Sequence, residues 1–174
     1  MSDDAYLAAS NAICARLAAL PAVAAAGTVH VYWPLVERRE VDTRPLIARL
    51  AEEGRRIVMP VMAPTERDPR AMRHRVFSGE DALLANTWGI HEPQGEEVAS
   101  REIDVVIVPA LGVGRNGHRI GHGKGFYDSF LAACPAYTAA AVFAACLLHH
   151  VTPEAHDVAV RAIVTEDEAV TLGG

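Results

Sequence analysis

The sequence has a single lysine, only three cysteines, and no apolar run of the roughly 18 residues that a membrane-spanning helix needs. The alanine-rich stretch 18–26 is interrupted by Pro21 and has no basic leader, so we expect no signal peptide. The odd cysteine count without a C-x-x-C pair argues against a disulfide scaffold or a structural zinc site. We therefore expect a cytoplasmic protein with no membrane partner.

Positive charge is also scarce. The formal net charge is −6, whereas a general nucleic-acid binder usually carries a basic surface, so we expect no nucleic-acid partner. All the cationic residues except Lys124 are arginines. A solvated surface rarely needs one particular lysine, but a phosphate site often does.

The 174 residues, 51% hydrophobic and 22% charged, fit one globular domain spanning 1–174, which we expect to be a monomer. Apolar periodicity predicts helices over 6–20, 43–54 and 125–133, and strands over 28–33, 56–62, 72–77, 104–109, 138–145 and 160–165. Strands that alternate with helices predict an α/β fold, here a three-layer α/β/α arrangement with a mostly parallel, Rossmann-like open sheet. Ligands bind such sheets where loops leave the carboxyl ends of the strands.

The most informative segment is 109–128, with the sequence PALGVGRNGHRIGHGKGFYD. It holds six of the thirteen glycines, and glycine costs folding entropy. This density indicates either positive φ angles or close approach of a ligand to the backbone. The segment contains Lys124 and has no acidic residue before Asp128. Backbone N–H groups, a helix start and a lysine together predict a polyphosphate site, with Asp128 within reach of a phosphate-bound Mg²⁺.

Several alternatives stay open from the residues alone. The glycine-rich segment lacks the order of a Walker A loop and can be an ordinary flexible loop. Asp157 either brings a second carboxylate to the sheet edge or caps a turn. Glu40 either accepts N–H donors of a heterocycle or is simply solvated. For Trp88 we expect a packing role.

Three motifs occur in a fixed order: YWPLVERREVDT at 32–43, NTWGIHEP at 86–93 and GHRIGHGKGFYD at 117–128. They resemble, respectively, the first-strand loop, the Trp-Gly-Ile-x-Glu-Pro element and the signature of the 5-formyltetrahydrofolate cyclo-ligase (methenyltetrahydrofolate synthetase) family. The C-terminal segment VTPEAHDVAVRAIVTED at 151–167 also fits this family. The resemblance spans most of the chain.

The resemblance implies an ATP- and Mg²⁺-dependent enzyme that converts 5-formyltetrahydrofolate to 5,10-methenyltetrahydrofolate and releases ADP and phosphate. It implies catalytic roles for Lys124 and Arg119, and Mg²⁺ coordination by Asp128 and Asp157. The residues implied to line the ATP phosphates are Arg119, Ile120, Gly121, His122, Gly123, Lys124, Gly125, Phe126 and Tyr127. The residues implied to contact the reduced folate are Leu35, Glu40, His122, Gly123, Lys124, Gly125 and Phe126, with Glu40 facing the pterin.

Three features depart from the family pattern. The family's first helix carries a Lys-x-x-Leu-Arg pattern that reaches ATP, and no lysine precedes Lys124 here. Three alternatives stay open for this departure: the start of the chain is truncated, Arg16 or another residue substitutes for the missing cations, or the affinity for ATP is reduced. Phe126 replaces the first tyrosine of Tyr-Tyr-Asp, and Val113-Gly114 replaces Phe-Asp. These departures keep two alternatives open: a noncatalytic or divergent nucleotide- or folate-binding member, and a sugar-phosphate isomerase-like enzyme without ATP.

Overall fold

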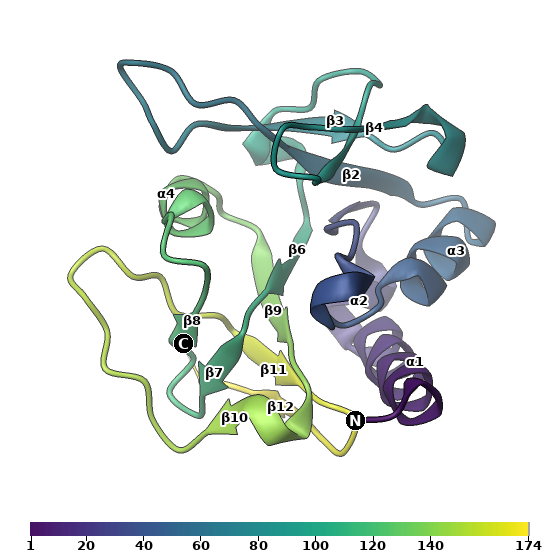
Figure 1. Cartoon of the computed structure of the whole chain (residues 1–174), viewed down its shortest axis with the longest axis vertical. Helices are drawn as coiled ribbons and strands as arrows, with labels where there is room; N and C mark the ends of the chain where they lie inside the picture. Colours follow the sequence, from purple (N-terminus) through teal and green to yellow (C-terminus); the bar gives the residue numbers. More distant parts are fainter. Residues whose placement is uncertain (174) are drawn as a thin grey trace.

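The computed structural model describes residues 1–173, which form a seven-stranded central sheet flanked by helices (Figure 1). The strand order is β12-β11-β9-β6-β1-β2-β3. The five inner strands, all parallel, are β1 (Thr28–His30), β2 (Arg56–Met62), β6 (Val105–Pro109), β9 (Tyr137–Ala141) and β11 (Ala162–Val164). The antiparallel edge strands are β3 (Met72–Val76) and β12 (Ala169–Thr171). The predicted α/β fold with a mostly parallel sheet is confirmed.

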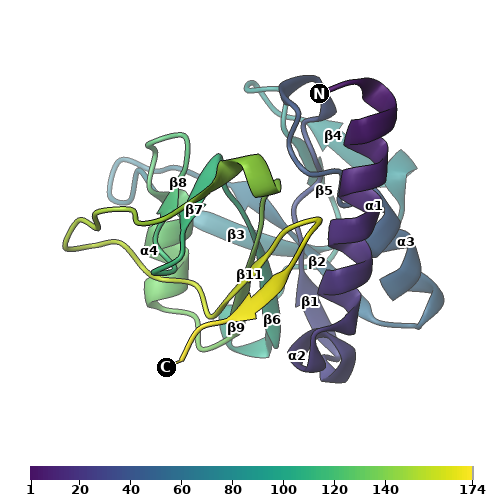
Figure 2. The same cartoon turned by 90° about the horizontal axis from the view of Figure 1, so that it is seen from below.

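Helices cover both faces of the sheet (Figure 2). One face carries α1 (Asp3–Ala19), α2 (Pro21–Ala25) and α3 (Arg44–Glu52), and the other carries α4 (Phe126–Ala132). Four 3-10 turns are η1 (Val36–Arg38), η2 (Glu80–Ala82), η3 (Ser100–Glu102) and η4 (Ala144–Cys146). Within residues 1–173, no helix has both the length and the apolar character needed to cross a membrane.

Two smaller sheets complete the fold. A three-stranded sheet has the order β10-β7-β8, built from β7 (Gly112–Gly114), β8 (Arg119–Ile120) and β10 (Leu147–Leu148). A hairpin consists of β4 (Leu83–Ala85) and β5 (His91–Pro93). The glycine-rich segment is therefore not one continuous loop, because it begins with paired strands and only then runs into α4.

Strand β6 shows why the sheet is buried on both faces. Val105 and Ile107 belong to the core under α1 and α3, whereas Val106 and Val108 belong to the core that contains Phe130 of α4. All four strand residues are at most 1% exposed. Because successive side chains of a strand point to opposite faces, a continuous apolar run is what a doubly covered strand requires.

The chain reverses direction across the sheet between β1 and β6. Helix α3 follows β1 and covers one face, while α4 follows β6 and covers the other. In open α/β sheets such a reversal leaves a crevice outside the carboxyl ends of the two strands. The fold therefore predicts a ligand site beyond His30 and Pro109.

Two of the predicted strands extend at least three residues beyond the ends that the structure shows. The first strand ends at His30 rather than Trp33, although the Val31 N–H still donates to the Val58 carbonyl (2.9 Å). Strand β9 ends at Ala141 rather than Ala145, because the chain turns into η4. In both places the apolar pattern continues after ladder pairing has stopped, so periodicity alone overextends the strand.

Two histidines are buried side by side under α4. His30 is 0% and His74 is 4% exposed, and their ring centroids lie 5.1 Å apart. Both rings also pack on Phe130, at 5.2 and 4.2 Å. Burial lowers the pKa of both histidines, that of His74 to about 4, and the neighbouring His74 lowers the pKa of His30 further. Both are therefore neutral at pH 7 in the folded chain.

We expect the variant His74→Phe to lose stability less steeply than the wild type as the pH falls from about 6.5 to 4. An unfolded histidine binds a proton near pH 6.5, whereas folded His74 does so only near pH 4. The unfolded state therefore binds more protons in this window, and acid favours unfolding by about 1.4 kcal/mol per pH unit for one such histidine. Urea unfolding across this pH range measures the slope for each protein.

The control for this experiment is the exposed His91→Gln. Its slope should match that of the wild type, because no buried ring has been removed. Equal slopes for His74→Phe and the wild type would contradict the assignment of this acid sensitivity to His74.

Candidate active site

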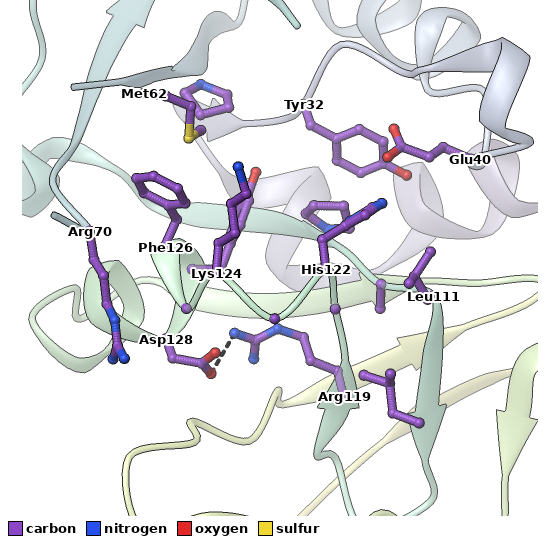
Figure 3. A pocket seen from close by; sticks show the side chains of 18 of the residues that line it. Tyr32, Glu40, Met62, Arg70, Leu111, Arg119, His122, Lys124, Phe126 and Asp128 are labelled. Atoms are coloured by element: carbon purple, nitrogen blue, oxygen red, sulfur yellow. Dashed lines mark hydrogen bonds and ion pairs between the residues drawn. The ribbon is translucent and has the colours of Figure 1, made fainter. Parts of the chain in front are cut away.

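A cavity of about 810 Å³ opens beyond the carboxyl ends of β1, β2 and β6. This size is typical of small-molecule sites. Tyr32 and Trp33 follow β1, Met62 ends β2 and Leu111 follows β6, while residues 119–128 form another wall (Figure 3). The cavity thus lies where the reversal of the chain predicts a ligand site.

The site residues implied by the family motifs all line this one cavity. They are Leu35, Glu40, Arg119, Ile120, Gly121, His122, Gly123, Lys124, Gly125, Phe126, Tyr127, Asp128 and Asp157. They come from the loop after β1, from the glycine-rich segment with the start of α4, and from the segment before β11. The fold therefore gathers distant parts of the sequence around one space.

The glycines of this segment fit both explanations of their density. Gly117, Gly123 and Gly125 have φ angles of +84°, +73° and +68°, a region that glycine adopts without the steric cost of a Cβ. A Cβ on Gly117 would also lie 2.9 Å from the Val160 carbonyl oxygen. A Cβ on Gly121 or Gly123 would meet nothing within 4 Å, so the backbone there is open to a ligand.

Lys124 projects into the cavity from the middle of the glycine-rich segment (Figure 3). Its Nζ lies 4.4 Å from the centroid of the Trp88 ring, a favourable cation–π distance. Trp88 is 40% exposed in the turn between β4 and β5, where its backbone N–H donates to Asn86 Oδ1 (2.9 Å). The prediction that Trp88 packs in the core is wrong, because the turn holds its ring at the cavity wall.

Arg119 and Asp128 form an ion pair at the base of the glycine-rich segment (Figure 3). Arg119 Nη2 donates to Asp128 Oδ1 (2.7 Å), and Nη1 donates to the Val158 carbonyl (2.7 Å). The Val158 N–H also donates to Asp128 Oδ1 (3.3 Å). The Arg119 side chain is only 5% exposed and that of Asp128 is 19% exposed. Arg119 is thus engaged with the protein itself and orients Asp128.

The two carboxylates implied to bind metal each keep one oxygen that accepts no hydrogen bond, although His156 Nε2 lies 3.9 Å from Asp157 Oδ1. Asp128 uses Oδ1 for both of its hydrogen bonds, and Asp157 Oδ2 accepts from the Glu154 N–H (2.8 Å). Among residues 1–173, no group of three or more His, Cys, Asp or Glu side chains is arranged to hold a metal ion. Mg²⁺ is commonly held by one or two carboxylates together with substrate phosphates. The pair therefore fits a Mg²⁺ that arrives with a polyphosphate, not a permanent all-protein site.

Glu40 lies on the other side of the cavity from Asp128 (Figure 3). Its Oε2 accepts from the Leu35 N–H (2.9 Å), and its carbonyl accepts from the Tyr6 hydroxyl (2.7 Å). Burial raises the pKa of Glu40, and the hydrogen bond from Leu35 opposes this rise. Arg39, just before it, has φ +56°, the only positive φ of a non-glycine residue in the described chain. This left-handed residue ends η1 and directs Glu40 back toward the cavity.

Arg16 lies away from the cavity. Its Nη2 donates to the Asp167 carbonyl (2.9 Å), in the turn between β11 and β12. Arg16 therefore does not line the cavity, because the face of α1 that carries it is turned toward the sheet edge.

The comparisons with known proteins agree with the motifs. A model of the 5-formyltetrahydrofolate cyclo-ligase family matches residues 1–166. The protein named 5-formyltetrahydrofolate cyclo-ligase from Mycolicibacterium smegmatis is 33% identical over 151 residues, which cover 82% of this chain and 75% of that protein. The mouse protein of this name is 29% identical over 140 residues, covering 74% and 68%. The Escherichia coli K12 protein is 33% identical over 119 residues, covering 67% and 63%.

The fold has a close counterpart among solved structures. The NMR structure of Aquifex aeolicus 5,10-methenyltetrahydrofolate synthetase superposes with a TM-score of 0.84 at 24% identity, covering 98% of this chain and 84% of that chain. The fold, the cavity at the chain reversal and these relatives define an α/β enzyme of the ligase class. More particularly, the chain belongs to the 5-formyltetrahydrofolate cyclo-ligase family. The resemblance stated from the motifs is confirmed.

Proposed function

We propose that the protein converts 5-formyltetrahydrofolate to 5,10-methenyltetrahydrofolate, consuming ATP with Mg²⁺ and releasing ADP and phosphate. The observation that supports this proposal is the single cavity that joins Glu40, Lys124, Asp128 and Asp157. It offers a polar acceptor for a heterocycle, a cation for phosphate and two carboxylates for a metal ion in one connected space.

The proposed reaction is a phosphoryl transfer followed by ring closure. The formyl oxygen attacks the γ-phosphorus and ADP leaves. N10 of the folate then attacks the formyl carbon, loses its proton and expels phosphate. Phosphoryl transfer depends mainly on positioning and charge neutralisation. Lys124 supplies a cation for the developing charge, and the open backbone at Gly121 and Gly123 lets the phosphates approach.

The carboxylates of the cavity have distinct proposed roles. Asp128 and Asp157 would hold Mg²⁺ through the oxygens that accept no hydrogen bond, and the bound ion would neutralise phosphate charge. Arg119 acts as a positioning residue, because its guanidinium is paired with Asp128 and does not face the cavity freely. Glu40 Oε1 makes no hydrogen bond within the described chain and is available to accept an N–H of the pterin.

The experiment that tests the proposal is a cyclo-ligase assay of the purified protein with ATP, Mg²⁺ and 5-formyltetrahydrofolate, followed by the absorbance of the methenyl product. We expect product that requires both ATP and Mg²⁺. Binding of ATP or folate without product would support a noncatalytic family member. If the protein neither binds ATP or folate nor forms product, this result would favour the sugar-phosphate isomerase-like alternative.

A further inference from the structure

Three side chains on one face of α1 hold the backbone that carries Glu40. The Tyr6 hydroxyl donates to the Glu40 carbonyl (2.7 Å). Further along α1, Ser10 Oγ accepts from the Asp42 N–H (3.1 Å), and Cys14 Sγ donates to the Asp42 carbonyl (3.2 Å). The segment between η1 and α3 lies outside every described strand, so its backbone polar groups need partners from elsewhere. Helix α1 supplies three of these partners.

The spacing and burial of these side chains suit this role. Tyr6, Ser10 and Cys14 are four residues apart, and residues four apart in a helix lie on the same face. All three are buried, and a buried polar group without a partner is costly. From the side of the sheet, the Tyr32 hydroxyl donates to the Val41 carbonyl (3.3 Å). The three successive carbonyls of the segment therefore each have a side-chain donor.

Tyr6 contacts both sides of the turn that precedes Glu40. Arg39 has φ +56°, a region that is unfavourable for a residue with a Cβ. Its guanidinium lies 5.0 Å from the centroid of the Tyr6 ring and pairs with Asp3 at the start of α1. That ion pair contributes little, because its side chains are 48% and 85% exposed. Strained backbone persists where surrounding contacts hold it, and here the buried contact is the Tyr6 hydroxyl on the Glu40 carbonyl.

We propose that Tyr6 is a positioning residue for Glu40, aided by Ser10 and Cys14: α1 fixes the loop backbone so that the Glu40 carboxylate is presented to the cavity. The inference rests on the proposed function, in which Glu40 accepts an N–H of the pterin. The carboxylate has one hydrogen bond of its own, from the Leu35 N–H to Oε2 (2.9 Å). A carboxylate that is held in place before the ligand arrives binds it without the entropic cost of being ordered.

The structural test compares Tyr6→Phe with its matched control Tyr137→Phe. Both tyrosines pack in or against the same apolar core, but the Tyr137 hydroxyl makes no hydrogen bond with any described residue. Hydrogen exchange of the Leu35 amide, followed by NMR, reports the position of Glu40, because this N–H donates to the Glu40 carboxylate. We expect exchange at Leu35 to be about fivefold faster in Tyr6→Phe, the size of one neutral hydrogen bond. The rate should be unchanged in Tyr137→Phe.

The kinetic test separates positioning of Glu40 from a general loosening of the fold. Tyr6→Phe should raise KM for 5-formyltetrahydrofolate about fivefold and leave KM for ATP unchanged. In a Glu40→Ala background, Tyr6→Phe should have no further effect on KM for the folate, because the side chain through which Tyr6 acts is gone. Tyr137→Phe should behave as the wild type with both substrates.

Failure of this inference and failure of the proposed function give different results. A wild-type protein that forms no methenyl product would contradict the proposed function, and exchange at Leu35 would still decide whether Tyr6 holds Glu40. Unchanged exchange at Leu35 in Tyr6→Phe would overturn the inference. An equal acceleration at the Glu154 N–H, which donates to a carboxylate in a different loop of the cavity, would overturn it as well. So would a rise in KM for the folate that persists in the Glu40→Ala background, because that effect does not pass through Glu40.

Discussion

Replacing Lys124 with alanine is expected to lower kcat of the cyclo-ligase reaction by at least about 100-fold, the scale of losing one oriented charge donor. The side chain is exposed, its ammonium lies over the Trp88 ring, and it makes no hydrogen bond or ion pair with any described residue. Its ammonium is therefore available to the phosphoryl group of the proposed reaction, and its removal leaves no buried group unpaired. The free energy of unfolding should consequently change by less than about 1 kcal/mol. Steady-state kinetics and urea unfolding of the same preparation measure both quantities.

Two control variants define what Lys124 contributes. Lys124→Arg keeps the charge but replaces a compact ammonium by a planar fork, so we expect partial activity. Trp88→Phe keeps an aromatic ring beside the lysine and should reduce kcat far less than Lys124→Ala. Near-normal turnover of Lys124→Ala would remove this residue from the mechanism.

The second large effect is expected on stability. Arg119→Met should lower the free energy of unfolding by about 3 kcal/mol, because it leaves the Asp128 carboxylate partly buried without its cation. Its matched control is Arg115→Met, which breaks the Arg115–Glu168 pair. That pair has a similar length, 2.6 Å against 2.7 Å, but its side chains are 52% and 41% exposed. An exposed pair contributes at most about 1 kcal/mol. Urea unfolding at pH 7 compares the two.

A double-mutant cycle with Asp128→Asn isolates the coupling between Arg119 and Asp128. Because the two side chains share one interaction, the double variant should be less destabilised than the sum of the single variants. Additive losses in the free energy of unfolding would contradict a coupling between Arg119 and Asp128. Equal losses for Arg119→Met and Arg115→Met would show that the buried pair stabilises the fold no more than the exposed pair does. Arg119→Met should also lose turnover, since Asp128 would no longer be held in place, whereas Arg115→Met should not.

The long buried strands of this fold were predictable from the sequence, whereas most of the strands of two or three residues were not. The strand over 56–62 has the predicted bounds, and the apolar run in β6 correctly indicated a doubly covered strand. Six strands that the sequence did not reveal have only two or three residues each: β4, β5, β7, β8, β10 and β12. Such lengths carry no measurable periodicity, and their pairing depends on partners that the tertiary fold supplies.

The candidate site shows the same division. The motifs identified residues that do line one cavity, because a family motif records which side chains share a site. They did not reveal that Arg119 is paired with Asp128, since this pairing also needs the Val158 backbone from a distant segment. Arg70 carried no signal at all, because its loop has no periodic or motif pattern and only the folded chain lays it against Gly125.

The single lysine has a practical consequence for labelling chemistry. Reagents that acylate or reductively alkylate amines have only two kinds of target in this protein, the α-amino group and Lys124 Nζ. Because that Nζ stands in the cavity wall, a compound occupying the cavity shields it. The extent of modification at Lys124, distinguished from that of the α-amino group by peptide mass, thereby measures how much of the protein has its cavity filled.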